Sequence, residues 1–436
     1  MSTSSQLTVN IFELLNTTAN YAVLRNYNGL PLNNSSRDID ILVEKKEFIE
    51  IESKIVDFII ASKFKITTLY RNEKIITYVC AKVDNGEIDL VQFDFFFNTS
   101  LFGILLLDVQ SVLKSKEFNG AIYHVSKEYE FLDKYLQLKF LNKPYPQKYK
   151  ALQVEMRQNK VLPNLLKQTT GAESLIALEG ITSAKFKRSV LFQNLKRKPI
   201  EQLKLLLLFI VYYIKNMTFY KGFSIGFTGP DGSGKTTIIN AIGNELRSVY
   251  TALKQFHFRP TIIPNLGETA HKTKLKPEVD KDYSNPHRGV KTGLISSFVR
   301  LLYYSIDYLV GYFLTIRPNL HKRNVVIFDR YFTDIIADSR RSSIFLNPKF
   351  LFWFGKLFIP SLDYNILLTA NKETILARKQ ELTAEGIENI NKKLNYLADK
   401  KGCYLVLNNE SPTEAVQKII TIIIDKQHQR NLKRIR

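Results

Sequence analysis

The sequence predicts an α/β protein built from two modules. The chain has 436 residues, which is more than one small domain needs. Short apolar strands, turns and helices alternate over residues 1–125, which indicates a small mixed α/β module. From Phe223 onward, strands, loops and helices follow one another regularly, as is typical of a parallel sheet flanked by helices. Helical spacing dominates residues 126–220, which we interpret as a helical connector.

The amino-terminal module is expected to contain the following elements. They are a helix over 9–19, strands over 21–24 and 39–43, a helix over 45–58, and strands over 75–83 and 87–97 joined by a turn at 84–86.

The connector ends in a basic stretch followed by an apolar one. Residues 185–204 carry seven Lys or Arg residues against one acid, Glu201, and Leu205–Ile214 has no charge. The apolar run is well short of the roughly 20 residues that span a bilayer. Two interpretations remain open: a helix packed on the core of the carboxyl-side module, or a helix lying on an anionic membrane surface. A second apolar stretch, Leu294–Ile316, contains Arg300 and Asp307, so we expect an amphipathic helix of a globular domain.

The composition is that of a folded, strongly basic protein. Hydrophobic residues make up 45% and charged residues 24%, which excludes global disorder. Lys and Arg number 62 against 41 Asp and Glu, a net charge of +21. A nucleic acid, an anionic lipid, a nucleotide, or a phosphorylated or acidic glycan would each match this excess, and a generally basic surface is the simple alternative. The charge alone does not choose among them.

The cysteines indicate a protein of a reducing compartment, and the histidines and cysteines indicate no structural zinc site. The two cysteines, Cys80 and Cys403, lie far apart in the sequence, and the six histidines form no HExxH or Cys/His cluster. The first residues lack a basic segment followed by an apolar core, so we expect no secretory signal. We therefore expect a cytoplasmic protein, with peripheral contact at the inner membrane face as the option that the connector leaves open.

A phosphate-binding loop is the strongest motif of the chain. The segment Gly229-Pro-Asp231-Gly232-Ser233-Gly234-Lys235-Thr236-Thr237 fits GxxxxGK[ST], with an apolar strand before it and a helical run after it. Glycines let backbone N–H groups surround a phosphate, and the following helix presents its positive dipole end. In such loops the lysine reaches the β- and γ-phosphates and the first threonine ligates Mg²⁺. This predicts ATP and Mg²⁺ as cofactors.

A second motif, further along the chain, places an aspartate and an arginine side by side at the end of an apolar strand. The apolar strand over 324–329 ends in Asp329, the residue type that a P-loop enzyme needs for the Mg²⁺ shell, and Arg330 follows at once. We expect Arg330 to face the cleft at the carboxyl end of the sheet and to hold an anionic acceptor. The alternative is an ion pair between Arg330 and Asp334 or Asp338 on its own helix.

Residues 221–425 resemble the thymidylate-kinase branch of P-loop nucleoside monophosphate kinases. The matching segments are Gly229–Thr237, Asp329-Arg330-Tyr331, a strand over 359–368, a helix with Ala377-Arg378-Lys379 at the place of the basic lid, and a strand over 404–407 that runs into a helix start at Ser411-Pro412. The resemblance implies that Arg378 covers the transferring phosphoryl group. The resemblance also implies that Asp231 of the loop contacts the acceptor.

The acceptor-reading segments depart from that family. Its Arg-Glu-Pro-Gly-Gly-Thr segment is replaced by His257-Phe-Arg259-Pro260, its Ala-Tyr-Gln stretch by residues 333–341, and a new segment carries Arg288. The ATP half of the site is therefore kept while the base-reading half is not. Arg259 and Arg288 are the next acceptor candidates after Arg330. The acceptor stays open between a nucleoside monophosphate such as dTMP and a sugar or glycan.

The amino-terminal module resembles nucleotidyltransferases of the polymerase-β type. A strand presents Asp38-Ile-Asp40, whose alternate side chains share one face and can hold Mg²⁺. The resemblance implies a third carboxylate, for which Asp89 is the first candidate and Asp94 the second. Arg25-Asn26 stands where that family has Gly-Ser, and two solvated aspartates are the simple alternative. The pairing of both modules resembles proteins of bacterial surface-polysaccharide clusters.

The sequence thus predicts a phosphotransferase with four segments. They are a nucleotidyltransferase-like domain over 1–125, the connector over 126–220, a P-loop kinase domain over 221–425 and a basic, frayed tail over 426–436. Expected partners are ATP and an anionic small molecule or glycan, with no specific nucleic acid, and a homodimer is left open. The alternative function is a nucleotide-binding regulatory or scaffold protein at an anionic membrane or polymer, without acceptor turnover.

Overall fold

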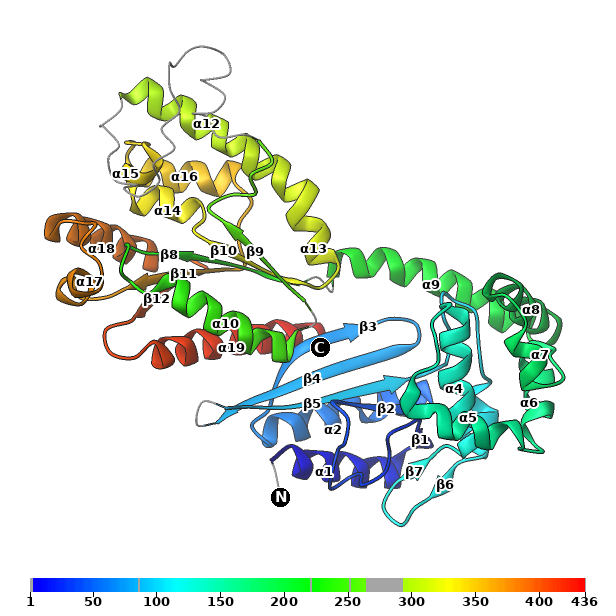
Figure 1. The fold of residues 1–436 in the computed structure, drawn as a ribbon. Helices are drawn as coiled ribbons and strands as arrows, with labels where there is room; N and C mark the ends of the chain where they lie inside the picture. Colours follow the sequence, from blue (N-terminus) through cyan, green and yellow to red (C-terminus); the bar gives the residue numbers. More distant parts are fainter. Residues whose placement is uncertain (1–2, 85–86, 220–221, 251, 264–292, 436) are drawn as a thin grey trace. The chain divides into compact units, whose positions relative to one another are not determined.

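A computed structural model describes residues 3–84, 87–219, 222–250, 252–263 and 293–435 (Figure 1). The chain divides into two compact units, Met1–Phe219 together with Ile424–Arg436, and Tyr220–Ile423. Each unit has its own β-sheet. The segment expected as a separate connector belongs to the first unit.

The first unit contains a seven-stranded mixed sheet in the order β3-β4-β5-β2-β1-β7-β6. Its strands are β1 (Tyr21–Val23), β2 (Asp38–Val43), β3 (Lys65–Arg71), β4 (Ile75–Asp84), β5 (Glu87–Phe96), β6 (Glu117–Phe118) and β7 (Tyr123–His124). β2 runs parallel to β5 and β1 parallel to β7, whereas the other pairs are antiparallel. The mixed sheet confirms the expected class, although β3, β6 and β7 were not expected. The predicted turn at 84–86 lies mostly outside the described residues.

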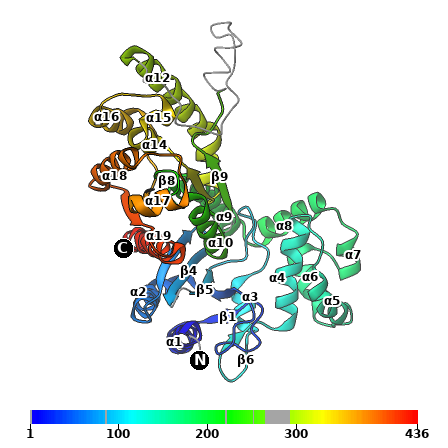
Figure 2. The ribbon, with the colours of Figure 1, turned by 60° about the vertical axis from the view of Figure 1, so that its left-hand side comes forward.

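Two helices, α1 (Thr3–Thr18) and α2 (Lys45–Ala61), lie side by side on one face of this sheet (Figures 1 and 2). The apolar residues of α2 recur every three or four positions, and Phe48, Ile51, Ile55 and Ile59 are all buried. This spacing gives the helix one apolar face, which packs onto the sheet through contacts such as Phe48 with Phe95.

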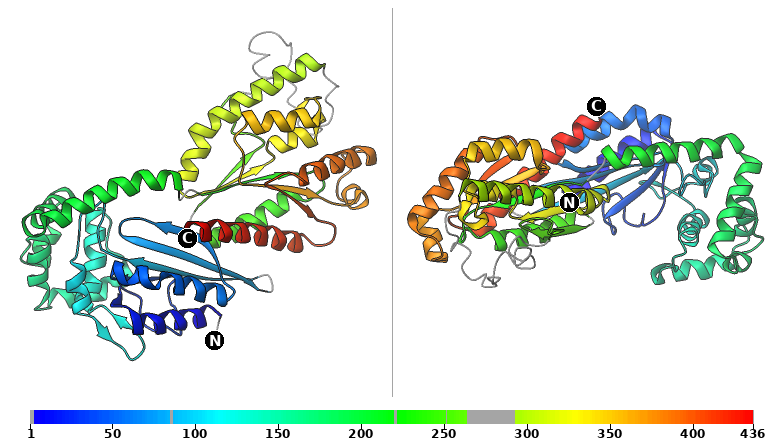
Figure 3. Two further views of the ribbon diagram at one scale, coloured as in Figure 1. Left: turned by 180° about the vertical axis from the view of Figure 1, so that it is seen from behind. Right: turned by 90° about the horizontal axis from the view of Figure 1, so that it is seen from above.

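The connector is helical, as its spacing predicts, and Figure 3 shows its helices grouped beside the sheet of the first unit. The helices after the first sheet strands are α3 (Val109–Lys114), α4 (Lys127–Phe140), a 3₁₀ turn (Gln147–Tyr149), α5 (Lys150–Arg157), α6 (Leu162–Thr170), α7 (Leu175–Glu179), α8 (Ser183–Arg197) and α9 (Pro199–Phe219). Buried side chains of α3 to α8 share one core with strands β1 and β2.

The apolar helix α9 belongs to the first unit, and its packing on the core of the carboxyl-side module stays a prediction. Its Gln202 is buried and donates a hydrogen bond of 2.7 Å to the carbonyl of Gly103. Gly103 has φ +76°, and a Cβ there would lie 2.9 Å from the Cα of Leu206, so this close approach requires glycine. Leu207 and Ile214 remain exposed on α9. Among the described helices, none is both long and apolar enough to cross a membrane.

The second unit contains a five-stranded parallel sheet in the order β12-β11-β8-β10-β9. Its strands are β8 (Ser224–Thr228), β9 (Leu253–His257), β10 (Val325–Asp329), β11 (Tyr364–Thr369) and β12 (Cys403–Leu407). This is the parallel sheet that the sequence predicts. β8 lies next to β10 with Phe227 opposite Asp329, which brings the phosphate loop and the acidic strand end together.

Helices cover both faces of this sheet, with α10 on one face and α14 and α16 on the other (Figures 1 and 3). The helices are α10 (Lys235–Val249), α12 (Leu294–Gly311), a π-helical turn (Tyr312–Ile316), α13 (Arg317–His321), α14 (Phe332–Ala337), α15 (Ser339–Ser342), α16 (Pro348–Phe358), α17 (Lys372–Arg378), α18 (Ala384–Ala398) and α19 (Pro412–Ile435). One apolar core joins β10 and β11 to α12, α14, α16 and α18.

Two local expectations differ from the structure. β11 starts at Tyr364 and not at residue 359, and the segment before it contains Pro360, which lacks the N–H that a sheet ladder needs. The expected frayed tail is part of α19, which continues to Ile435. β3 is an edge strand with unpaired backbone groups, and the tail caps it: His428 Nδ1 accepts from Ile66 N–H at 3.0 Å, and Asn431 donates to the Ile66 carbonyl at 2.9 Å.

Candidate functional site

The phosphate loop connects β8 to α10 and owes its shape to its glycines. A Cβ at Gly229 would lie 2.1 Å from the carbonyl oxygen of Leu368, which no side chain tolerates. Gly234 has φ +86°, a left-handed conformation, and a Cβ there would lie 2.5 Å from the side-chain nitrogen of Asn408. The loop is therefore held close to β11 and to the segment after β12.

Lys235 lies folded back into this loop. Its side chain is 6% exposed, and its Nζ donates to the carbonyls of Gly229 and Pro230 at 2.8 Å each. Burial, assisted by the positive charge of Arg330, lowers the pKa of Lys235 to about 7. Its Nζ lies 3.9 Å from Oδ1 of Asp231, and an anion bound in the loop would supply a further counter-charge to this buried ammonium.

The loop has further polar groups besides Lys235. The hydroxyl of Ser233 is buried and has no hydrogen-bond partner among the described residues, and neither has Oδ1 of Asn408. Asn408 donates to the Ser233 carbonyl at 2.9 Å. Thr236 and Thr237 are exposed at the first turn of α10, where a phosphate or its cation is accessible to their hydroxyls.

Asp329 ends β10 beside the loop. Its Oδ1 is buried without a partner among the described residues, and its Oδ2 lies 3.9 Å from Nε2 of His257. A buried carboxylate oxygen without a donor costs free energy unless a cation or donor binds it. Asp329 and Thr236 therefore fit the expected Mg²⁺ shell.

Arg330 does not present an open guanidinium. It is 5% exposed, its Nη2 lies 2.6 Å from Oδ1 of Asp231, and its Nη1 lies 3.0 Å from Oδ1 of Asp334. The alternative of an ion pair within its own helical segment is thus the observed state. Arg330 also has φ 77°, held by a 2.9 Å hydrogen bond from its N–H to the Phe227 carbonyl. Such a backbone costs about 1–3 kcal/mol, and it aims the guanidinium back at the phosphate loop.

A second arginine reaches the loop, one that the sequence did not single out. Arg341 of α15 forms a close ion pair with Asp231, and its Nε lies 3.5 Å from Oδ2 of Asp338. Arg330 and Arg341 thus converge on one carboxylate of the loop. Burial raises the pKa of Asp334, although Arg330 opposes the shift. The departing segment 333–341 was the signal in the sequence, but a partner that lies 110 residues before Arg341 could not be identified there.

The remaining predicted residues lie in different surroundings. Arg378 is exposed at the end of α17 and donates to the carbonyls of Asn408 and Asn409, at 2.8 and 3.3 Å. Arg259 is buried, 3.0 Å from Asp307 of α12 and over the ring of Tyr304, so the structure does not support its predicted contact with an acceptor. Arg288 lies outside the described residues.

The comparisons with known proteins agree with a nucleotide-binding loop on a parallel sheet. Residues 206–431 match the model of the KAP family P-loop domain. The chain belongs to this family. P-loop domains bind a nucleotide together with Mg²⁺. The KAP domain model begins within α9 and ends within α19, so it includes every strand of the second sheet.

A thymidylate kinase from Ehrlichia chaffeensis is among the similar solved structures, at 16% sequence identity and a TM-score of 0.33. The match covers 47% of this chain and 99% of the kinase. No curated protein matches the chain. The fold of the KAP domain is established here by its strand order and its phosphate loop.

The first unit contains a separate group of carboxylates, those of Asp38, Asp40 and Asp94, whose oxygens lie within 4.8 Å of one another. Asp38 and Asp40 alternate on β2, and the parallel register places Asp94 of β5 opposite Asp40. Asp89, the first candidate for the third carboxylate, is elsewhere and accepts a hydrogen bond from Ser4 N–H. It lies five positions before Asp94 on β5, an odd number, so the alternation of strand side chains turns it to the other face.

The cluster is buried and carries more negative than positive charge. Asp40 is 1% exposed, its Oδ2 accepts from Arg25 Nε at 2.6 Å, and its Oδ1 has no partner among the described residues. Burial raises the pKa of Asp40 to about 7; Arg25 opposes this shift and Asp38 adds to it. Asp133, 3.7 Å from Arg25, is also buried with a raised pKa. The unpartnered oxygen and the excess of carboxylates fit a divalent cation.

Proposed function

We propose that the KAP domain transfers the γ-phosphoryl group of ATP to an anionic acceptor. One observation carries this proposal. The phosphate loop, with its buried Lys235 of lowered pKa, lies beside Asp329, whose Oδ1 has no partner among the described residues. Such an arrangement is suited to a nucleotide phosphate and its cation. Asp231 holds the guanidinium groups of Arg330 and Arg341 at the loop, and in this proposal they lie near the transferred phosphoryl group.

Each residue then has a defined part. On nucleotide binding, Lys235 would exchange the carbonyls of Gly229 and Pro230 for phosphate oxygens. Asp329 and Thr236 would hold Mg²⁺, which when bound neutralises phosphate charge and orients the phosphate oxygens. Asp231 keeps Arg330 and Arg341 at the loop. Arg378 lies on the carbonyls of Asn408 and Asn409, from which it could move onto the nucleotide.

The acceptor class is a nucleoside monophosphate such as dTMP or a sugar or glycan, as in surface-polysaccharide synthesis. The net charge of +21 favours an anionic acceptor but does not distinguish these. The rival function is nucleotide binding or hydrolysis in a regulatory or scaffold protein, without acceptor turnover.

A transfer assay with γ-labelled ATP separates the two functions. The full chain is incubated with Mg²⁺ and a panel of nucleoside monophosphates, sugar phosphates and acidic oligosaccharides, and labelled products are resolved from free phosphate. We expect label on one acceptor class and little free phosphate. Release of free phosphate alone, unchanged by every acceptor, would establish hydrolysis and contradict the kinase proposal.

A second activity, nucleotidyl transfer, is proposed for the first unit because of its acidic cluster. The three carboxylates of Asp38, Asp40 and Asp94 and the unpartnered Oδ1 of Asp40 support it. The test is formation of a nucleotidyl product from α-labelled nucleotides and Mg²⁺, with the double variant Asp38→Asn, Asp40→Asn as comparison. Equal product from both proteins would exclude the cluster as the site.

Cytoplasmic location with peripheral contact to an anionic membrane is also a proposal. Leu207, Val211 and Ile214 are exposed on α9, directly after the basic end of α8, which supports it. Co-sedimentation with vesicles containing anionic lipid tests it, and binding equal to that of neutral vesicles or none would count against it.

A further inference from the structure

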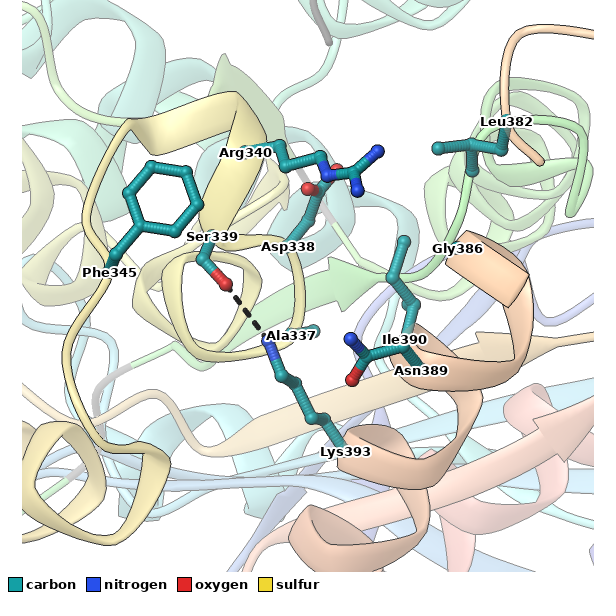
Figure 4. Close-up of a pocket in the computed structure, with 10 residues that line it drawn as sticks. All are labelled: Ala337, Asp338, Ser339, Arg340, Phe345, Leu382, Gly386, Asn389, Ile390 and Lys393. Carbon is teal, nitrogen blue, oxygen red and sulfur yellow. Dashed lines mark hydrogen bonds between the residues drawn. The ribbon is translucent and has the colours of Figure 1, made fainter. Parts of the chain in front are cut away.

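A cavity of about 490 Å³ lies in the second unit between the segment α14–α15 and helix α18, apart from the phosphate loop residues (Figure 4). Ser339 and Arg340 of α15 lie on one wall and Asn389 and Lys393 of α18 on the other, as Figure 4 shows. The full lining is Ala337, Asp338, Ser339, Arg340, Phe345, Leu382, Gly386, Asn389, Ile390 and Lys393. Its volume suits a ligand the size of a sugar phosphate or nucleotide.

The cavity has an excess of positive charge. Within the described part of the chain, the guanidinium of Arg340 has no hydrogen bond or ion pair, and the ammonium of Lys393 donates only to Ser339 Oγ, at 2.9 Å. Burial lowers the pKa of Lys393, an effect that the negative charge of Asp338 opposes. Asp338, the one carboxylate in the lining, is already engaged by Arg341 through its backbone N–H and its Nε. An anion placed between Arg340 and Lys393 would therefore meet two positive charges that no carboxylate contacts.

The rest of the lining suits a ring that bears hydroxyl groups. Leu382 and Ile390 are buried apolar side chains, and Phe345 adds an aromatic ring. The Ser339 hydroxyl and the Asn389 amide provide donors and acceptors for hydroxyls or for a base. Apolar surface with a few convergent polar groups is the usual character of a small-molecule site.

The same short helix connects this cavity to the phosphate loop. α15 contributes Ser339 and Arg340 to the cavity, and its next residue, Arg341, pairs with Asp231 of the loop. Asp338 lines the cavity and also contacts Arg341. By contrast, Arg330 and Arg259, which the sequence favoured for the acceptor, are both buried against carboxylates.

We propose that this cavity is the acceptor pocket and that it binds a phosphate monoester of a hydroxyl-bearing ring, through Arg340 and Lys393. The inference rests on the proposed phosphotransferase function and names its substrate class. In the transfer step, an anionic oxygen of the acceptor phosphate forms a bond to the γ-phosphorus of ATP. The bond from that phosphorus to the β–γ bridging oxygen breaks, and ADP leaves with the electron pair, so no proton must be removed from the acceptor. A sugar phosphate and a nucleoside monophosphate share this chemistry.

Binding and transfer are measured separately on the full chain. Calorimetry without ATP uses glucose 1-phosphate, glucose 6-phosphate, dTMP and UMP, with glucose and thymidine as uncharged controls, for wild type, Arg340→Gln and Lys393→Met. Lys392→Met, the exposed neighbour on α18, is the matched control, and thermal melting checks that each variant is folded. We expect one phosphate monoester to bind, its uncharged analogue not to bind, at least tenfold weaker binding in both pocket variants, and wild-type binding in Lys392→Met. Arg340→Lys is expected to recover part of the affinity because it keeps the charge.

The outcomes separate the pocket from the proposed function. Selective binding of the sugar phosphates, or of the nucleotides, identifies the source, and either supports the pocket. A bound phosphate monoester that loses affinity in the pocket variants but never receives label from ATP supports the pocket and overturns the phosphotransferase function. Labelled product formed equally by wild type and both folded pocket variants overturns the pocket and leaves the function standing. If none of the four phosphate esters binds, the pocket proposal is likewise overturned.

Discussion

The acidic cluster of the first unit and the phosphate loop of the second unit respond to burial in opposite directions. In the cluster, burial raises the pKa of Asp40 to about 7, and in the loop burial lowers the pKa of Lys235 to about 7. In both cases the low-dielectric surroundings disfavour the charged form. Both side chains have a partner within the chain. Asp40 pairs with Arg25, and Lys235 donates to the carbonyls of Gly229 and Pro230.

The difference shows what each site lacks. The cluster has an excess of carboxylates that one arginine does not neutralise, so it is suited to a cation. In the loop, Lys235, Arg330 and Arg341 all lie near Asp231, and backbone N–H groups at the start of α10 join them, so the loop is suited to an anion. The following predictions test this contrast, beginning with the largest expected effect.

Lys235→Ala removes the buried cation of the phosphate loop. We expect phosphoryl transfer or hydrolysis to fall by about a thousandfold, because this charge acts on the phosphates where negative charge develops. Lys418→Ala, an exposed lysine on α19, is the control and should keep full activity. Initial rates at saturating ATP give the answer, and a wild-type rate in the folded Lys235→Ala protein would show that the loop is not the active site.

Asp94→Asn tests whether the third carboxylate is the one that the register places opposite Asp40. Loss of one of three carboxylate ligands should weaken Mn²⁺ binding by about a hundredfold. Asp89→Asn, on the same strand but the other face, should bind Mn²⁺ as wild type does. Electron paramagnetic resonance of free Mn²⁺ measures both proteins. The reverse order of effects would restore Asp89 as the ligand.

The two sites should have opposite pH dependences. Below pH 7 Asp40 takes up a proton, which must leave before a cation binds, so the Mn²⁺ affinity of the cluster should rise by up to tenfold per pH unit as pH approaches 7 from below. Above pH 7 Lys235 loses its proton, so nucleotide affinity should fall by up to tenfold per unit as pH rises. Titrations from pH 5.5 to 8.5 measure both. If the Mn²⁺ affinity and the nucleotide affinity changed in the same direction with pH, the contrast between the two sites would be contradicted.

Arg25→Gln removes the internal counter-charge of Asp40. The variant should be less stable, since breaking a buried ion pair costs about 3–5 kcal/mol. Its stabilisation by Mn²⁺ should be several-fold larger than in wild type, as measured by the shift in Tm, because the cation then replaces the lost guanidinium. A metal-dependent Tm shift that is unchanged or smaller in the variant would mean that Arg25 helps to hold the metal and does not compete with it.

Much of the fold and part of the site could be predicted from local pattern. The glycine spacing of 229–234 and the apolar strands before Gly229 and Asp329 specify local geometry, because backbone conformations at glycine and strand periodicity depend on near neighbours. The alternation Asp38-Ile-Asp40 likewise specifies two carboxylates on one face. The helical continuation of the tail was missed, since its polar residues are partnered by the edge of β3, far away in the sequence.

The partners of the charged side chains were decided by the tertiary structure alone. Local sequence pattern was enough to predict the two α/β units, the phosphate loop with Lys235, and the strand that ends in Asp329. Only the strand register selected Asp94 over Asp89, and only packing turned Arg330 toward Asp231 and buried Arg259 against Asp307. The physical reason is that charge pairing depends on distances between segments many residues apart, whereas strand and loop geometry depends on short-range backbone sterics.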